Sequence, residues 1–197
     1  MEPMISAILL AAGISRRMGE DKLLLIYSGK SLLQRAVDLL SVLPVFEKFL
    51  VTTNERLGKI DIPRDVQVVI NTDPEAGQSG SVKLGVSAAA GDRYLFLAAD
   101  QPRLVPADLQ QLIDSSLHYG NSIVYPVING KPCSPSLFSA IFRAELLALS
   151  GDAGGRIIRA GHPEACIEIT PERPENFCDI DSKEDYRRLI ESTEILE

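Results

Sequence analysis

The chain has 197 residues, of which 45% are hydrophobic and 24% charged, so it is long enough to bury one sizeable core. Its net charge of −7 and pI near 5.0 argue against a general nucleic-acid-binding protein, because such proteins usually present a basic face. We find no membrane-spanning apolar run, no leader segment and no CxxC pair among the three cysteines. We therefore expect a soluble, cytoplasmic protein with reduced thiols, whose partners include neither nucleic acid nor a membrane.

The first predicted element is a strand over residues 5–10, a nearly continuous apolar run that is typical of a strand buried on both faces. Ala11, Ala12 and Gly13 follow this strand and remove side-chain bulk, so a ligand can approach the backbone closely. The next residues supply a hydroxyl group and three cations, namely Ser15, Arg16, Arg17 and Lys22. A small, cationic loop directly after a buried strand favours the binding of phosphate groups.

Helices and strands alternate through the following hundred or so residues. Helices are predicted over residues 31–43, 79–90 and 106–118, and strands over residues 46–53, 66–70 and 93–99. This repeated β-α pattern predicts an α/β fold with a three-layer, doubly wound and mostly parallel sheet. In such sheets, ligands gather beyond the carboxyl ends of the strands.

The pattern becomes less regular after Tyr125, where a turn-rich stretch contains four proline and glycine residues. Beyond it we predict helices over residues 138–149, 154–160 and 182–193, and one strand over residues 166–170. No internal repeat or linker interrupts the chain, so we expect a single domain over residues 1–197.

The strongest motif is LAAGxSxRMGxxK, which the sequence matches from Leu10 to Lys22. It resembles the MobA-like nucleotidyltransferases, and LAAG in place of LAGG resembles their molybdenum cofactor cytidylyltransferase branch. The resemblance implies a Rossmann-like nucleotidyltransferase fold and the transfer of CMP from CTP to a phosphorylated acceptor, with release of pyrophosphate. It implies molybdenum cofactor as that acceptor, and a molybdenum hydroxylase as a further partner. The nucleotide-binding part then covers about residues 1–125, and the acceptor-side part about residues 126–197.

The resemblance also assigns roles to individual residues. Arg17 and Lys22 would offset phosphate charge, and Asp100 in the DQP triplet would hold Mg²⁺ (or Mn²⁺) with Asp181 as second ligand. The nucleotide would be bound by Leu10, Ala11, Ala12, Gly13, Ser15, Asn71, Gln78, Ser79 and Ser81.

Each of these motifs also has a purely structural interpretation. An aspartate after an apolar strand is often only a turn or cap residue, and glycine and serine before a helix often form only a turn. The segment around Asp181 fits a helix N-cap with acidic residues in the first turn, and Asp179 is the weaker candidate for a metal ligand.

The acceptor side departs from the family pattern at one place. Family members carry a GHP-like triplet where this chain has residues 130–135, although the later GDxGxR pattern is present. Lys131 or Arg156 would meet the phosphate of the acceptor, and Lys131 is equally compatible with a solvated loop.

Two other function classes remain open from the sequence. One is a related transferase that uses GTP to form molybdopterin guanine dinucleotide, or that acts on a sugar or alcohol phosphate. The other is an accessory protein for molybdenum hydroxylases that binds a nucleotide or cofactor without turnover. The sequence lacks GxGxxG after the first strand, a GxxxxGK[ST] loop and a GxSxG elbow, so dehydrogenase, P-loop and hydrolase functions are poorly supported.

Overall fold

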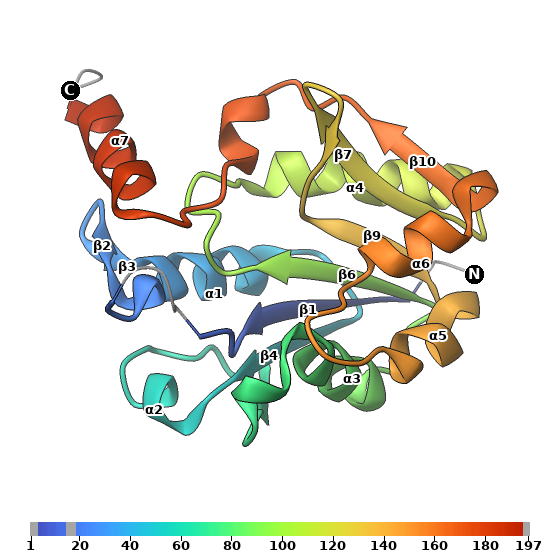
Figure 1. Ribbon diagram of the computed structural model, residues 1–197, viewed down its shortest axis with the longest axis horizontal. Helices are drawn as coiled ribbons and strands as arrows, with labels where there is room; N and C mark the ends of the chain where they lie inside the picture. The colour runs from blue at the N-terminus through green and yellow to red at the C-terminus, as the bar shows by residue number, and fades with distance from the viewer. Residues whose placement is uncertain (1–3, 15–18, 195–197) are drawn as a thin grey trace.

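The apolar strand β1 (Ile5–Ala11) lies in the middle of an eight-stranded sheet in the computed structural model, which describes residues 4–14 and 19–194 (Figure 1). The strand order is β10-β7-β9-β6-β1-β4-β5, with β8 paired to the edge of β7. The other strands of this sheet are β4 (Glu47–Thr52), β5 (Gln67–Ile70), β6 (Arg93–Ala98), β7 (Ile123–Ile128), β8 (Lys131–Pro132), β9 (Ser136–Ser139) and β10 (Cys166–Ile169). Only β8 and β9 pair antiparallel with their neighbours here, so the predicted mostly parallel sheet is confirmed.

Helices cover both faces of the sheet, as Figure 1 shows. One face packs against α1 (Leu32–Val42) and α4 (Pro106–His118), and the other against α3 (Gln78–Ala88), α5 (Arg143–Ala148) and α6 (Arg156–Gly161). In β1, successive side chains enter opposite cores, with Leu9 on the α1 side and Ile8 on the α3 side. This alternation explains why the strand reads as a continuous apolar run. The three-layer α/β fold predicted from the sequence is confirmed.

The strand order reverses at β1. The chain leaves β1 toward β4 and β5 on one side, and then crosses to β6 on the other side. In open α/β sheets, a crevice forms where the connections diverge in this way. The carboxyl ends of β1 and β6 lie at this point, so the loop that contains Gly13 and the turn that contains Asp100 face the same crevice.

The helix predicted over residues 138–149 begins later than expected. Residues 136–139 form β9, a short 3-10 turn follows, and the α-helix starts only at Arg143. Leu137 is buried in the core on the α4 side and Phe138 in the core on the α3 side, as in a strand between β6 and β7. Burial on both faces removed the alternation that distinguishes a strand from a helix in the sequence. Strand β7 escaped prediction because Pro126 interrupts its apolar run, and a proline inside a run argues against a strand.

The carboxyl-terminal helix α7 (Lys183–Glu194) packs beside a small hairpin formed by β2 (Ile26–Tyr27) and β3 (Lys30–Ser31). The Tyr186 hydroxyl donates a hydrogen bond to the Ile26 carbonyl at 2.6 Å. A four-residue helix, α2 (Asn54–Leu57), follows β4. Among the described residues, no helix combines the length and the apolar character needed to cross a membrane.

Candidate active site

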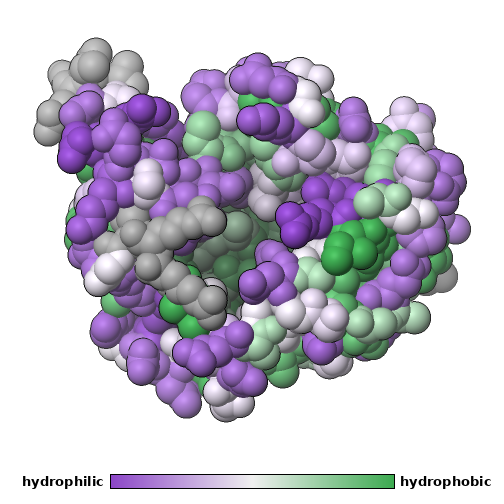
Figure 2. All heavy atoms as spheres, in the orientation of Figure 1, coloured by the Kyte–Doolittle hydropathy of each residue, from purple (hydrophilic) through white to green (hydrophobic). Residues whose placement is uncertain are grey.

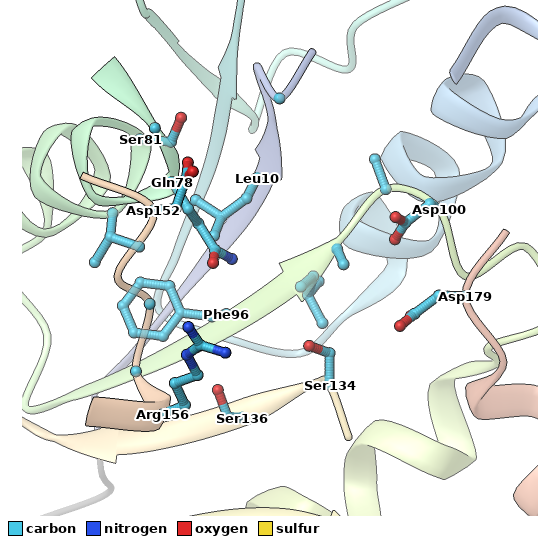
Figure 3. Close-up of a pocket in the computed structure, with 18 of the residues that line it drawn as sticks. Leu10, Gln78, Ser81, Phe96, Asp100, Ser134, Ser136, Asp152, Arg156 and Asp179 are labelled. Atoms are coloured by element: carbon cyan, nitrogen blue, oxygen red, sulfur yellow. The ribbon is translucent and has the colours of Figure 1, made fainter. Parts of the chain in front are cut away.

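A cleft of about 800 Å³ opens at the carboxyl ends of β1 and β6 and continues between α3 and α6 (Figures 2 and 3). Most of the predicted site residues line it: Leu10, Gly13, Lys22, Gln78, Ser81, Asp100, Arg156 and Asp181. Ala11 and Ala12 are buried and do not line the cleft themselves. Ser15 and Arg17 lie outside the described residues.

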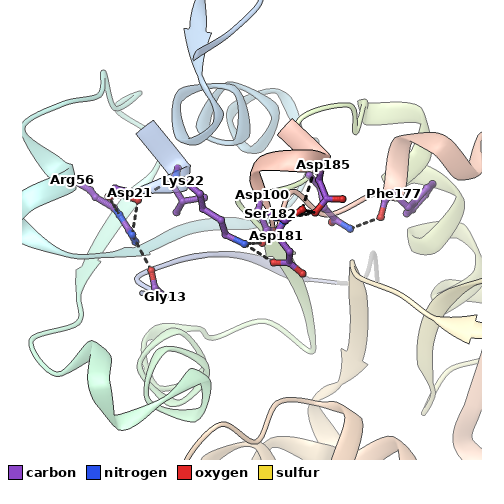
Figure 4. A network of polar contacts seen from close by, with 11 residues as sticks. Gly13, Asp21, Lys22, Arg56, Asp100, Phe177, Asp181, Ser182 and Asp185 are labelled. Carbon is purple, nitrogen blue, oxygen red and sulfur yellow. Dashed lines mark hydrogen bonds and ion pairs between the residues drawn. The ribbon is translucent and has the colours of Figure 1, made fainter. Parts of the chain in front are cut away.

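Arg56, which no sequence motif singles out, holds the backbone of the first loop. Its side chain is 7% exposed, and its guanidinium group donates to the Ala11 carbonyl at 2.6 Å and the Gly13 carbonyl at 2.9 Å. The same group forms a bidentate ion pair with Asp21 at 2.7 and 2.8 Å (Figure 4). Asp21 also accepts the Leu23 amide at the start of a 3-10 turn, and this turn begins with Lys22. Arg56 therefore ties the small-residue loop to the turn that carries Lys22.

Lys22 lies between two of the predicted metal ligands. Its ammonium group is 2.6 Å from Asp100 Oδ2 and 2.8 Å from Asp181 Oδ1. Burial alone would lower the pKa of Lys22, but the neighbouring carboxylates of Asp100 and Asp181 outweigh it, so the net shift of this pKa is upward. The lysine therefore stays positively charged in the cleft over the physiological pH range.

Asp181 reaches this position because the residues that follow it cap α7. The Ser182 amide and hydroxyl donate to Asp185 Oδ2, and the Asp185 amide donates back to the Ser182 hydroxyl. The Ile180 amide donates to the Asp100 carbonyl at 2.9 Å. The helix cap and the metal-ligand interpretation thus apply to neighbouring residues, and Asp181 itself faces Lys22.

The carboxylates of the cleft leave a local excess of negative charge. Asp100 Oδ1 is buried and has no hydrogen-bond partner among the described residues. Desolvation in the cleft, followed by the charges of Asp100 and Asp181, raises the pKa of Asp179 to about 7. Asp179 was the weaker candidate in the sequence, yet its side chain points into the cleft beside Asp100 (Figure 3).

Gln101 connects the three segments that meet at these carboxylates. The side chain is 4% exposed, and its Nε2 group donates at 3.0 Å to both the Ser134 and the Phe177 carbonyls. One contact fixes the loop before β9 and the other fixes the segment that leads to Asp179. The glutamine of the DQP triplet therefore holds these three segments together through its hydrogen bonds.

The start of α3 forms the opposite wall. The buried Asn71 side chain donates to the Ser81 hydroxyl at 3.1 Å and accepts the Asp73 amide at 2.9 Å, so it shapes this wall from behind. The Ser79 side chain is also buried, and its amide donates to the Gly151 carbonyl at 3.1 Å. Of the residues predicted to contact the nucleotide in this segment, only Gln78 and Ser81 line the cleft.

Gly77 brings this helix start against the loop after α5. It has φ +90° and ψ −177°, and an added Cβ atom would lie 2.5 Å from the backbone carbon and oxygen of Gly151. We expect Gly77→Ala to lower the free energy of unfolding by about 3 kcal/mol, because backbone strain and a backbone clash add. Gly120→Ala is the matched control, since Gly120 has φ +57° with no atom within 4 Å of an added Cβ. It should cost only about 1 kcal/mol. Equal losses in urea denaturation would contradict the close contact with Gly151.

The far part of the cleft has an apolar floor and a basic wall. Phe96 and Leu10 lie on the floor, while Arg156 points into the space between Phe96 and Ser136 (Figure 3). Arg159, one turn further along α6, also lines the cleft. Lys131 is exposed in β8 and is not part of the lining, in line with the solvated-loop alternative.

Comparisons with known proteins show which proteins this chain resembles. A protein of Chloroflexus aggregans named probable molybdenum cofactor guanylyltransferase is 38% identical over 112 residues, which are 55% of this chain and 52% of that protein. The chain therefore spans about half the length of this relative. A Thermococcus kodakarensis protein of the same name is 30% identical over 197 residues, 94% of each chain. The structure of a nucleotidyl transferase from Methanothermobacter thermautotroptrophicus has a TM-score of 0.81 at 25% identity, covering 98% of this chain and 99% of that one. The model of the MobA-like NTP transferase domain matches residues 7–166, and the chain belongs to this family.

Proposed function

We propose that this protein transfers a nucleoside monophosphate from an NTP to the phosphate of a molybdopterin-type acceptor and releases pyrophosphate. The observation that carries the proposal is the cationic Lys22 between Asp100 and Asp181, beside the Gly13 loop at the switch point of the sheet. Proteins named molybdenum cofactor guanylyltransferase among the relatives support the choice of acceptor.

The carboxylates fit a magnesium or manganese ion. Asp100 Oδ1 is a buried carboxylate oxygen without a partner in the described part of the chain, and Asp179 and Asp181 lie near it. Within residues 4–14 and 19–194, no three His, Cys, Asp or Glu side chains form a complete metal site. This suits Mg²⁺, which binds one or two carboxylates and completes its shell with phosphate oxygens and water. Bound there, the ion would supply charge stabilisation for the triphosphate.

The residues of the chain would contribute to the reaction through their positions and their charges. Lys22 would offset charge on the phosphates and on the departing pyrophosphate, and Arg17 is proposed to do the same. The loop backbone, fixed by Arg56 at the Ala11 and Gly13 carbonyls, would approach the nucleotide without side-chain obstruction. The attacking oxygen belongs to the phosphate of the acceptor and is already anionic near neutral pH, so no protein base is required. In-line placement of that oxygen against the α-phosphorus would supply most of the rate acceleration.

We propose CTP as the donor and GTP as the second candidate. The LAAG segment supports CTP, while the names of the relatives support GTP. The Ala12 side chain is 2% exposed, so its methyl group occupies space behind the cleft that a glycine would release.

Ala12→Gly is therefore expected to shift specificity toward GTP. The ratio of kcat/KM for GTP to that for CTP should rise about tenfold, because a difference of one methyl in a packed pocket is worth on the order of 1–3 kcal/mol. Gly58→Ala, an exposed change with no atom within 4 Å of the added Cβ, should leave this ratio unchanged. A ratio unaffected by Ala12→Gly would remove the structural basis for CTP.

The direct test is pyrophosphate release by the purified protein with each NTP, with Mg²⁺ or Mn²⁺, and with purified molybdenum cofactor. Release that needs CTP, a divalent ion and the cofactor is the expected result. Release that occurs with GTP and not with CTP would favour the second candidate. The absence of release in every combination would overturn the proposal and favour a non-catalytic accessory protein for molybdenum hydroxylases.

A further inference from the structure

Two arginines of α6 line the cleft together with Gly13. Arg156 and Arg159 are three residues apart, which places them on the same side of a helix, and both line the cleft. Neither forms an ion pair with a carboxylate in the part of the chain that the structure describes. In a chain with net charge −7, two cleft arginines without acidic partners indicate that their counter-ion arrives with a ligand.

Arg159 is held in a fixed orientation. Its guanidinium group stacks on the Tyr125 ring at 4.4 Å from the ring centroid. The Tyr125 hydroxyl in turn donates to Glu168 at 3.1 Å, so the ring is anchored between β7 and β10. Stacking uses the face of the guanidinium plane and leaves its edge, which carries the N–H donors, available to a ligand. A planar fork of this kind matches two oxygens of a phosphate group.

The surroundings of the two arginines define what kind of molecule fits. Phe96 and Leu10 provide an apolar floor, and Arg156 lies between Phe96 and Ser136. Burial, followed by the charge of Asp179, raises the pKa of the Cys133 thiol, which also lines the cleft, and the charge of Arg159 partly opposes this rise. Both arginines and the carboxylates of Asp100, Asp179 and Asp181 therefore line one cleft, and Arg159 also borders a smaller pocket beside Tyr125 and Glu168.

We infer that Arg159, together with Arg156, binds the phosphate monoester of the acceptor while the ring system of the acceptor lies on Phe96 and Leu10. This inference rests on the proposed function and names the residues that select the acceptor. It replaces Lys131, which lies outside the cleft lining, with Arg159, which sequence reasoning did not select. The phosphate of the nucleotide donor stays at the other end, with Lys22.

The kinetic test separates the two substrates. Arg159→Gln is expected to raise KM for purified molybdenum cofactor about tenfold or more and to leave KM for the NTP unchanged. Arg159→Lys keeps the charge without the planar fork and should lie between wild type and Arg159→Gln. Arg188→Gln on α7 is the matched control, because Arg188 is 72% exposed and pairs only with Glu184 among the contacts of the described chain. A rise in KM for the NTP instead would place the arginines on the donor side and overturn the inference.

Binding of a phosphate monoester to the cleft can be tested without the transfer reaction. Cys133 lines the cleft, so its rate of alkylation by iodoacetamide reports occupancy, and the exposed Cys178 serves as an internal reference in peptide mass spectrometry. Millimolar phenyl phosphate, a ring with one phosphate monoester, should slow alkylation of Cys133 relative to Cys178 in the wild type. The ratio of rates with and without phenyl phosphate should return to one in Arg159→Gln.

The outcomes of the two tests separate this inference from the proposed function. Protection of Cys133 by pyrophosphate but not by phenyl phosphate would overturn the inference, as would equal protection in Arg159→Gln. If the wild type releases no pyrophosphate with any substrate yet phenyl phosphate protects Cys133 through Arg159, the proposed reaction fails and the phosphate site stands. If the wild type is active and protection is absent, only the inference fails.

Discussion

Asp100→Asn is expected to lower kcat/KM for nucleotidyl transfer by at least about 100-fold, equivalent to about 2.7 kcal/mol of transition-state stabilisation. Asparagine has nearly the same shape, but it removes the negative charge that faces Lys22 at 2.6 Å. It also replaces the buried, unpartnered Oδ1 with a group that binds a hard cation poorly. The loss should therefore fall on the chemical step and not on folding.

Two further measurements make this prediction specific. Binding of Mn²⁺, followed by electron paramagnetic resonance without substrates, should weaken about tenfold or more in Asp100→Asn. Asp114→Asn is an exposed change on α4, where the carboxylate accepts a hydrogen bond only from Gln110 within the described part of the chain, and it should leave activity and Mn²⁺ binding unchanged. Full activity of Asp100→Asn would show that the proposed metal role is wrong, while the fold assignment would stand.

The parts of the fold that the sequence predicted are those in which one local pattern decides the structure. The apolar run of β1, the Ser31 cap of α1 and the apolar stripe of α4 each specify one element without help from distant residues. Ser31 accepts the Gln34 amide at 3.1 Å, as a cap should. The alternation of these elements was sufficient to predict the sheet and the edge at which ligands gather.

Residues whose environment is created by distant segments could not be found in this way. Phe138 forms a strand because β6 and β7 lie on either side of it, and no local periodicity records those neighbours. Asp179 is the weaker candidate in the sequence because the family resemblance assigns the second ligand to Asp181, whereas its raised pKa depends on desolvation in the cleft and on Asp100, far away in the sequence. Lys131 lies on β8 and Arg159 on α6, and only the folded structure shows that Arg159 lines the cleft while Lys131 does not.

Arg56 is the clearest example of a residue whose environment is created by distant segments, and its substitution is expected to have a large effect. Arg56→Met is expected to lower the free energy of unfolding by about 3 kcal/mol, because it removes one partner of a mostly buried ion pair and leaves Asp21 uncompensated. The change also frees the Ala11 and Gly13 carbonyls, which lose charge-assisted hydrogen bonds at 2.6 and 2.9 Å. Urea denaturation followed by circular dichroism measures this loss.

Matched variants separate the ion pair from general effects of mutation. Lys59→Met removes an exposed cation in the segment after α2 and should change stability by less than about 0.5 kcal/mol. Arg56→Lys keeps the charge but cannot reach both carbonyls and both Asp21 oxygens, so it should fall between wild type and Arg56→Met. In a double-mutant cycle with Asp21→Asn, we expect a coupling energy of about 1–3 kcal/mol. Because Asp21 also caps the turn that begins with Lys22, Arg56→Met should raise KM for the NTP as well. A coupling energy near zero would mean that Arg56 supports the loop only through the two carbonyls, and Lys22 would then be positioned independently of it.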